Sequence, residues 1–300
     1  MVKYRKDRKI IKISYIALAI VFIFLSWTAI SLAEVDFNKL NLLADDKFLQ
    51  KVKIYELNSV QLDLLLHELQ RRFPDKDDRL KAIATMYLGA DYYKEPFIDE
   101  LKDPLPYSRT NCTMFVLYAT TFLNSSNYEE ALETIRWVHY KGGVVGYKNR
   151  YHFTSDRITD PDNKYFTDVT TNYVVDQSFI RELTLTLNVK QDGSLLFEGK
   201  LGGWKKTITI KYIKRGDFTI DKLKKLPRSI GIAFVKKSNW PIGVIIGHEG
   251  ILIDGDLYHS SCPTLGLYKI EDYLSESFPF SDWEGMMLFE INVINNKNTE

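Results

Sequence analysis

Apolar residues recur at helical spacing in the first third of the chain. Between Ser59 and Phe73, leucines stand about one helical turn apart, and Pro74 ends the run. This pattern predicts a helix with Ser59 as its N-cap. Together with the neighbouring apolar positions, this pattern predicts that residues 34–100 are mostly helical. We expect them to form one domain with residues 101–300.

Two further helices are predicted in the middle of the chain. Residues Cys112 to Leu123 are almost wholly apolar after their first positions. Residues Asn127 to Tyr140 alternate apolar and charged positions at helical spacing, and Asn127 and Glu130 have the spacing of a capping box. The helical pattern then ends, and from about residue 175 the period changes to that of strands.

The second half of the chain contains short apolar or β-branched runs separated by Gly, Asp or Pro. Such runs are typical of β-strands. The expected strands are Leu183–Val189, Ser194–Glu198, Thr207–Ile213, Ile230–Val235, Val244–Ile253, Asp256–Ser260 and Met287–Val293. Helices first and an antiparallel sheet second predict an α+β fold.

The strands on either side of Asp254-Gly255 are expected to form a β-hairpin, because Asp-Gly between apolar runs is a strong signal for a two-residue turn. That turn pairs Ile253 with Asp256. Continuing the register places His259 opposite Gly250, so that His248 lies on the same face two residues along. Diagonal neighbours of this kind are about 7–8 Å apart, so the two histidines are expected to form an imidazole pair.

The N-terminus has the pattern of an export signal. Residues 13–33 carry no charge and follow a cluster of six basic residues, Lys3, Arg5, Lys6, Arg8, Lys9 and Lys12. The apolar run is close to the roughly 20 residues that span a membrane. Residues 1–33 are therefore expected to be a signal peptide cleaved after Ala33 or a retained signal anchor, with the remainder in the periplasm or at the outer face of the cytoplasmic membrane.

Cys112 is the candidate nucleophile. At the start of a predicted helix, the helix dipole and the unpaired N–H groups favour a thiolate, and the same N–H groups can stabilise an oxyanion. An inert buried cysteine is the alternative. His248 as base and His259 as the residue that orients it would complete the minimum arrangement for acyl transfer through a thioester. The second cysteine, Cys262, is expected to be free, although a disulfide with Cys112 is a further alternative.

Four segments carry a family resemblance. Residues 88–92 (LGADY), 111–116 (NCTMFV), 247–253 (GHEGILI) and 258–261 (YHSS) resemble the NlpC-type cell-wall hydrolases in order and spacing. Residues 150–153 (RYHF) with 168–170 (DVT) look like the envelope-amidase branch first catalogued as a domain of unknown function. Members of that branch are similar to N-acetylmuramoyl-L-alanine amidases. The resemblance spans roughly Leu88 to Ile291.

The resemblance implies a papain-like α+β fold in which Cys112 leads a helix that packs on the sheet carrying His248 and His259. It also implies that Tyr92, which matches a tyrosine beside the catalytic cysteine, contacts the oxyanion or the substrate. No cofactor is expected.

Arg150 and His152 are candidate substrate-binding residues on the same resemblance, although a solvent-facing loop histidine is an equal interpretation of His152. The chain departs from the family at three positions. Asn111 replaces an aspartate, Met114 a threonine and Leu117 an acidic residue. The first two flank the nucleophile, so altered activity is one expectation.

No two histidines have the spacing of a zinc site, so no metal is expected. The chain has no nucleic-acid-binding motif. Lysines and arginines outnumber acidic residues between Lys200 and Arg228. This basic segment can hold an anionic polymer, but such a pattern is more often simply a solvated strand face.

The sequence thus predicts an exported cysteine amidohydrolase acting on peptidoglycan or muropeptides, with the bond between N-acetylmuramic acid and L-alanine as the favoured target. A D-glutamyl-diamino acid endopeptidase of the same superfamily is one alternative. A non-catalytic wall-binding protein, anchored in the membrane through residues 13–33, is another.

Overall fold

The computed structural model describes residues 37–40, 42–95, 97, 99–219, 222–274 and 282–294. The predicted export segment, residues 1–33, lies outside these residues. Among the residues described, no helix is both long enough and apolar enough to span a bilayer. The internal contacts of the chain divide it into two units, residues 1–42 and 43–300. The first contains helix α2, Phe37–Leu40, and everything below concerns the second.

Most helices of the second unit lie in its first half, in agreement with the apolar periodicity. They are α3 Asp45–Lys51, α4 Ser59–Arg72, α5 Lys76–Met86, α6 Cys112–Leu123, α7 Tyr128–His139, α8 Thr154–Thr159 and α9 Ile270–Leu274. Short 3₁₀ helices connect them: Ile54–Glu56, Lys141–Gly143, Tyr147–Asn149, Thr170–Tyr173, Gln177–Phe179, Arg215–Asp217 and Lys237–Ile242.

One predicted helix cap differs from the structure, and a second is confirmed without the full capping box. Asn58, not Ser59, caps α4, and it forms a complete capping box with Gln61. The amide side chain of Asn58 can accept a hydrogen bond one position earlier, so Ser59 becomes the first helical residue. Asn127 caps α7 as predicted. The Glu130 carboxylate, however, accepts hydrogen bonds from the backbone N–H and hydroxyl of Ser126, the residue before the cap.

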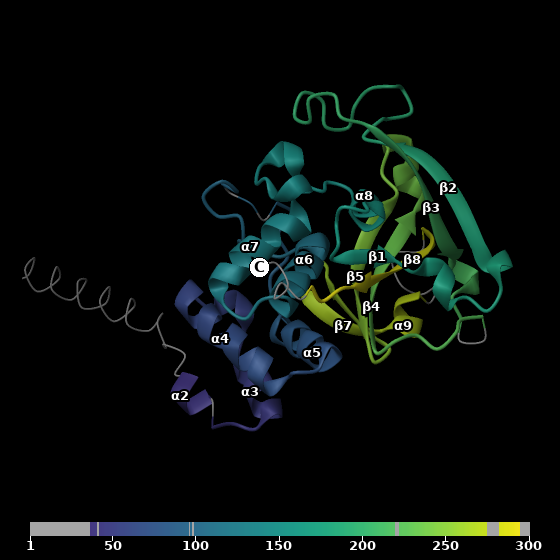
Figure 1. Cartoon of the computed structure of the whole chain (residues 1–300). Helices are drawn as coiled ribbons and strands as arrows, with labels where there is room; N and C mark the ends of the chain where they lie inside the picture. The colour runs from purple at the N-terminus through teal and green to yellow at the C-terminus, as the bar shows by residue number, and fades with distance from the viewer. Residues whose placement is uncertain are drawn as a thin grey trace, which may run out of the picture. The chain divides into compact units, whose positions relative to one another are not determined.

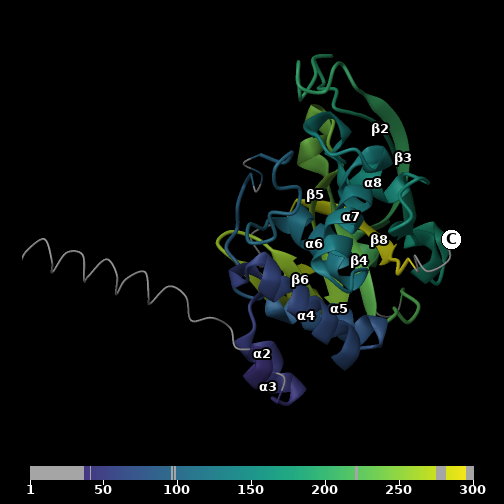
Figure 2. The ribbon, with the colours of Figure 1, turned by 60° about the vertical axis from the view of Figure 1, so that its left-hand side comes forward.

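Helix α6 is the central helix of this unit. Every residue from Met114 to Leu123 is buried, because α6 packs against α5 and α7 on one side and against β5 on the other. The ring of Tyr87, just after α5, stands edge-on to that of Phe115 with centroids 5.9 Å apart. In Figures 1 and 2, α6 lies between the other helices and the sheet. The start of α6 is therefore held against the sheet.

The strands form one antiparallel sheet in the order β2-β3-β8-β4-β5-β6-β7, and β1 also pairs with β8. Their bounds are β1 Phe166–Asp168, β2 Ile180–Leu187, β3 Lys206–Lys214, β4 Ser229–Lys236, β5 Ile246–Ile253, β6 Asp256–Ser260, β7 Leu265–Lys269 and β8 Trp283–Ile291. The predicted α+β class is confirmed.

The predicted hairpin register is confirmed between β5 and β6. Ile253 pairs with Asp256, and Ile251 pairs with Tyr258. The two turn residues, Asp254 and Gly255, have φ angles of 53° and 86°. A two-residue turn of this hand requires positive φ at both positions, which Asp and Gly tolerate better than most residues.

The predicted strand Ser194–Glu198 is wrong. These residues belong to a turn-rich connection between β2 and β3, with a single bridge from Leu195 to Val189. The connection rises beyond the ends of the strands in Figures 1 and 2. Its apolar side chains explain the misleading pattern, because Phe197 packs on the rings of His152 and Phe153 instead of pairing in the sheet.

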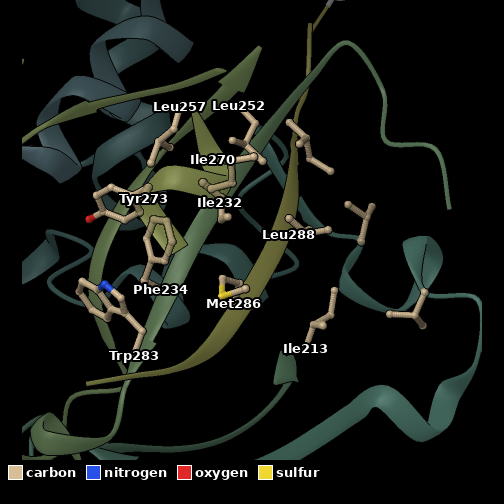
Figure 3. Close-up of a cluster of buried hydrophobic side chains, with 13 residues drawn as sticks. Ile213, Ile232, Phe234, Leu252, Leu257, Ile270, Tyr273, Trp283, Met286 and Leu288 are labelled. Carbon is tan, nitrogen blue, oxygen red and sulfur yellow. The ribbon is translucent and has the colours of Figure 1, made fainter. Parts of the chain in front are cut away.

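One face of the sheet carries an apolar cluster built from β4, β5, β6, β8 and α9. Figure 3 shows Phe234, Tyr273 and Trp283 together at one end of this cluster. The ring of Phe234 lies 5.2 Å from that of Tyr273 and 5.4 Å from that of Trp283. This aromatic end of the cluster adjoins the histidine on β5 described below.

On the opposite face, Gly231 of β4 pairs with Phe289 of β8, whose ring covers the glycine. A Cβ at Gly231 would lie 2.1 Å from a ring carbon of Phe289. We predict that Gly231→Ala lowers the free energy of unfolding by about 1–3 kcal/mol through overpacking. Urea unfolding measures this, with Gly216→Ala as the control, since a Cβ there meets no atom within 4 Å. Equal stability of the two variants would contradict the prediction.

Candidate active site

A small cavity opens where the start of α6 meets β5 and the segment leading into α8. Its volume is about 100 Å³. Three stretches of chain line it: Cys112 and Thr113, residues 152–155, and residues 244–249. The candidate nucleophile and His248, the candidate base, therefore face the same cavity, although 136 residues separate them in the sequence.

Cys112 is the first residue of α6, as predicted. The helix is capped by Asn111, whose side-chain oxygen accepts from the N–H of Met114 at 2.9 Å. The preceding residue, Thr110, is fully buried, and its hydroxyl lies 3.2 Å from the hydroxyl of Ser260 and 3.2 Å from the Asp91 carbonyl. These bonds fix the loop that presents Cys112. Asn111, at the position where the resemblance implies an aspartate, thus caps the helix.

His248 and His259 form the expected imidazole pair. Nε2 of His248 lies 2.7 Å from Nδ1 of His259, and the ring planes are nearly perpendicular at 88°. The hairpin register brings the two rings to the same face of the sheet, and the glycine opposite His259 leaves room for them, because a Cβ at Gly250 would lie 3.0 Å from the Cβ of His259.

Aromatic rings surround the histidine pair. His248 lies about 6 Å from the rings of Phe234, Tyr273 and Trp283, and the ring of Tyr273 lies 4.9 Å from that of His259. Burial among these rings lowers the pKa of His248 to about 3, with smaller contributions from the charges of His259 and Lys236. Burial also lowers the pKa of His259 to about 4. Both imidazoles are therefore neutral near pH 7.

The Cys112 thiol differs from the sequence expectation. Burial, with a smaller contribution from the Glu249 carboxylate, raises its pKa to about 11, against the opposing effect of hydrogen bonds with Thr113 and with the Glu249 backbone. A helix N-terminus alone would favour the thiolate, but here the loss of solvent is the larger effect. The resting site holds a thiol and two neutral imidazoles.

Glu249, which sequence reasoning missed, ties the walls of the cavity together. Its carboxylate is fully buried and accepts from the Thr154 hydroxyl at 2.7 Å and from Arg157 at 2.5 Å. Both partners lie on α8, so the ion pair holds α8 against β5 beside Cys112. A signal was present in the sequence, because a glutamate in an apolar strand requires a buried partner. The position of that partner could not be read from the pattern.

Tyr92 lies near Cys112. Its N–H donates to the carbonyl of Pro263 at 2.9 Å, and it pairs with Thr110. Burial raises the pKa of its phenol, and Cys112 and Cys262 add smaller effects through their charge. Cys262 is exposed, and both cysteines are free.

His152 lines the cavity with Cys112, but Arg150 does not. Nε2 of His152 lies 2.6 Å from the carbonyl oxygen of Tyr147, so that nitrogen carries the proton and donates. Arg150 instead forms an ion pair with Glu100 at 2.5 Å and lines a neighbouring hollow. Among the ranges that the structure describes, no group of three or more His, Cys, Asp or Glu side chains is arranged to bind a metal ion.

Comparison with known families gives one match. The family model described as N-acetylmuramoyl-L-alanine amidase-like matches residues 82–259. This range contains Cys112, His248 and His259. No curated protein gives a significant match to the sequence.

Several solved structures share the fold. A Legionella pneumophila protein with the family model DUF1460 has a TM-score of 0.60 at 16% identity, over 78% of this chain and 97% of its own. An N-acetylmuramoyl-L-alanine amidase from Bacteroides uniformis has a TM-score of 0.53 at 17% identity, over 73% of this chain and 100% of its own. A putative xylanase from Bacteroides fragilis has a TM-score of 0.52 at 16% identity, over 70% of this chain and 99% of its own.

The buried histidine pair makes stability depend on pH. Both rings have a pKa near 6.5 when unfolded and near 3 to 4 when folded, so between these values the unfolded chain binds more protons. We predict that their contribution to the unfolding free energy is complete above about pH 6.5 and is lost as the pH falls toward about 4. Urea unfolding across this range measures the slope. His259→Phe should make it shallower, and an unchanged slope would contradict the assignment.

The two thiols should also react at different rates. Near neutral pH we expect iodoacetamide to modify exposed Cys262 at least about tenfold faster than the partly exposed Cys112, whose raised pKa suppresses the thiolate. Peptide mass spectrometry of the alkylated protein gives both rates, and Cys262→Ser isolates that of Cys112. Faster modification of Cys112 would show that the helix N-terminus outweighs burial.

Proposed function

Because the chain belongs to the N-acetylmuramoyl-L-alanine amidase-like family, we propose that it is a cysteine-dependent amidohydrolase acting on peptidoglycan or muropeptides. The proposed target is the amide bond between the lactyl group of N-acetylmuramic acid and L-alanine. The observation that carries this proposal is the hydrogen bond between His248 and His259 at the edge of the cavity lined by Cys112.

In the proposed mechanism, His248 is the general base. A proton on its Nε2 donates to Nδ1 of His259 and leaves Nδ1 of His248 free to accept the proton of the Cys112 thiol. His259 thereby selects the tautomer of His248. The sulfur attacks the substrate carbonyl, and the resulting oxyanion is stabilised by N–H groups at the start of α6, with Tyr92 beside them.

The protonated His248 then gives its proton to the leaving nitrogen as the C–N bond breaks, which leaves a thioester on Cys112. Water adds to the thioester with His248 again as base, and the free acid and the thiol are released. The raised pKa of Cys112 suits this order of events. A buried thiolate facing an imidazolium would be costly to maintain at rest, whereas proton transfer during attack creates the charge only as the new bond forms.

Two features of the architecture support a papain-like, NlpC-type assignment of the fold. The candidate nucleophile begins a buried helix, and the histidines lie on an antiparallel sheet packed against it. We further propose that the protein is exported, because residues 13–33 are apolar and follow a basic cluster. In that case the site faces the compartment that contains the cell wall, and a retained segment would anchor it to the membrane.

The test is incubation of the purified protein with defined muropeptides and analysis of the products by mass spectrometry. We expect release of intact stem peptides, and a loss of at least about 10³-fold in turnover for Cys112→Ala. Cys262→Ser is the matched control and should retain activity. Equal turnover by Cys112→Ala would exclude the proposed nucleophile. Products cut within the stem peptide would identify an endopeptidase instead.

A further inference from the structure

A second hollow lies directly beside the cavity that contains Cys112. The two share His152 and Phe153 in their linings, so one layer of side chains separates them. The 3₁₀ turn Tyr147–Asn149 and the connection between β2 and β3 form its rim. A substrate that is bound at Cys112 and extends across His152 and Phe153 would reach this hollow.

The hollow is basic. Around it lie Lys141, Lys148, Arg150, Lys200 and Lys206, facing three carboxylates. The carboxylates are Glu95 and Glu100, which pair with Arg150, and Asp156, which pairs with Lys141 and Lys206.

Two of these cations have no carboxylate partner among the described residues. Lys148 is exposed and lines the hollow, and among the described residues no carboxylate pairs with it. Lys200, also without a carboxylate partner in the described part of the chain, lies with its Nζ 5.9 Å from the centre of the Tyr147 ring. The remaining cations are neutralised, which leaves an excess of positive charge at the mouth of the hollow.

The size of the hollow limits what it can hold. Its volume is about 10 Å³, which is room for about one water-sized group. A single carboxylate oxygen fits this space, whereas a sugar ring does not. Aromatic side chains form the remaining wall, with Trp204 stacked on Phe153 at 5.6 Å and Lys141 held over Trp204 at 4.4 Å. This packing keeps the hollow in place.

We propose that this hollow is a subsite for a carboxylate of the stem peptide, with Lys148 as its principal contact and Lys200 in support. The inference rests on the proposed function. With the bond before L-alanine at Cys112, the next residue of the stem is D-glutamate, and its α-carboxylate lies about two residues from the scissile carbonyl. The subsite therefore selects stems in which this carboxylate is free over stems in which it is amidated.

The experiment compares two tripeptide muropeptides that differ only in whether the α-carboxyl of D-glutamate is free or amidated. For the wild-type protein we expect a KM about five- to tenfold lower for the free acid, the effect of one charge-assisted contact at a partly exposed site. Lys148→Gln should raise KM for the free acid by the same factor, leave kcat unchanged and barely affect the amidated substrate. Added salt should reduce the difference.

Lys164→Gln is the matched control, because Lys164 is an exposed lysine that lines a separate hollow beside α7. It should behave as the wild type with both substrates. Wild-type turnover of both muropeptides with equal KM, or an equal effect of Lys148→Gln on both, would overturn the subsite while leaving the amidase assignment intact. Failure of the wild-type protein to cleave either muropeptide would instead refute the proposed function.

Discussion

The candidate active site depends on one hydrogen bond, between His248 and His259, and that bond depends on the register of the β5–β6 hairpin. Side chains alternate between the two faces of a strand, so a slip of one residue would turn one ring away from the other. The Asp254-Gly255 turn prevents such a slip, because its two positive φ angles close the hairpin at one position only. A local constraint on the backbone thus sets the geometry of the histidine pair.

Burial then determines the charge of the site. The aromatic rings around His248 and the packing of α6 against β5 remove solvent from the histidines and from the thiol together. All three groups respond in the same direction, toward their neutral forms. A neutral resting site is compatible with the proposed acyl-transfer mechanism, in which charge develops only during attack.

The buried ion pair of Glu249 and Arg157 has a structural role. Glu249 follows His248 on β5, and its ion pair with Arg157 holds α8 beside Cys112. Because both groups are fully buried, neither can be removed alone without leaving an unpaired charge. Cys112, His248 and the segment around His152 thus line one cavity. The basic hollow adjoins that cavity through His152 and Phe153.

The sequence alone determined the elements whose causes are local. It predicted the bounds of the helix that starts at Cys112, and it predicted the hairpin register that pairs the histidines, since periodicity and turn chemistry act over a few residues. Only the tertiary structure decided the state of the thiol, the partner of Glu249 and the packing of Phe197, which resembled a strand residue. These depend on burial and on contacts between distant segments, which no local pattern encodes.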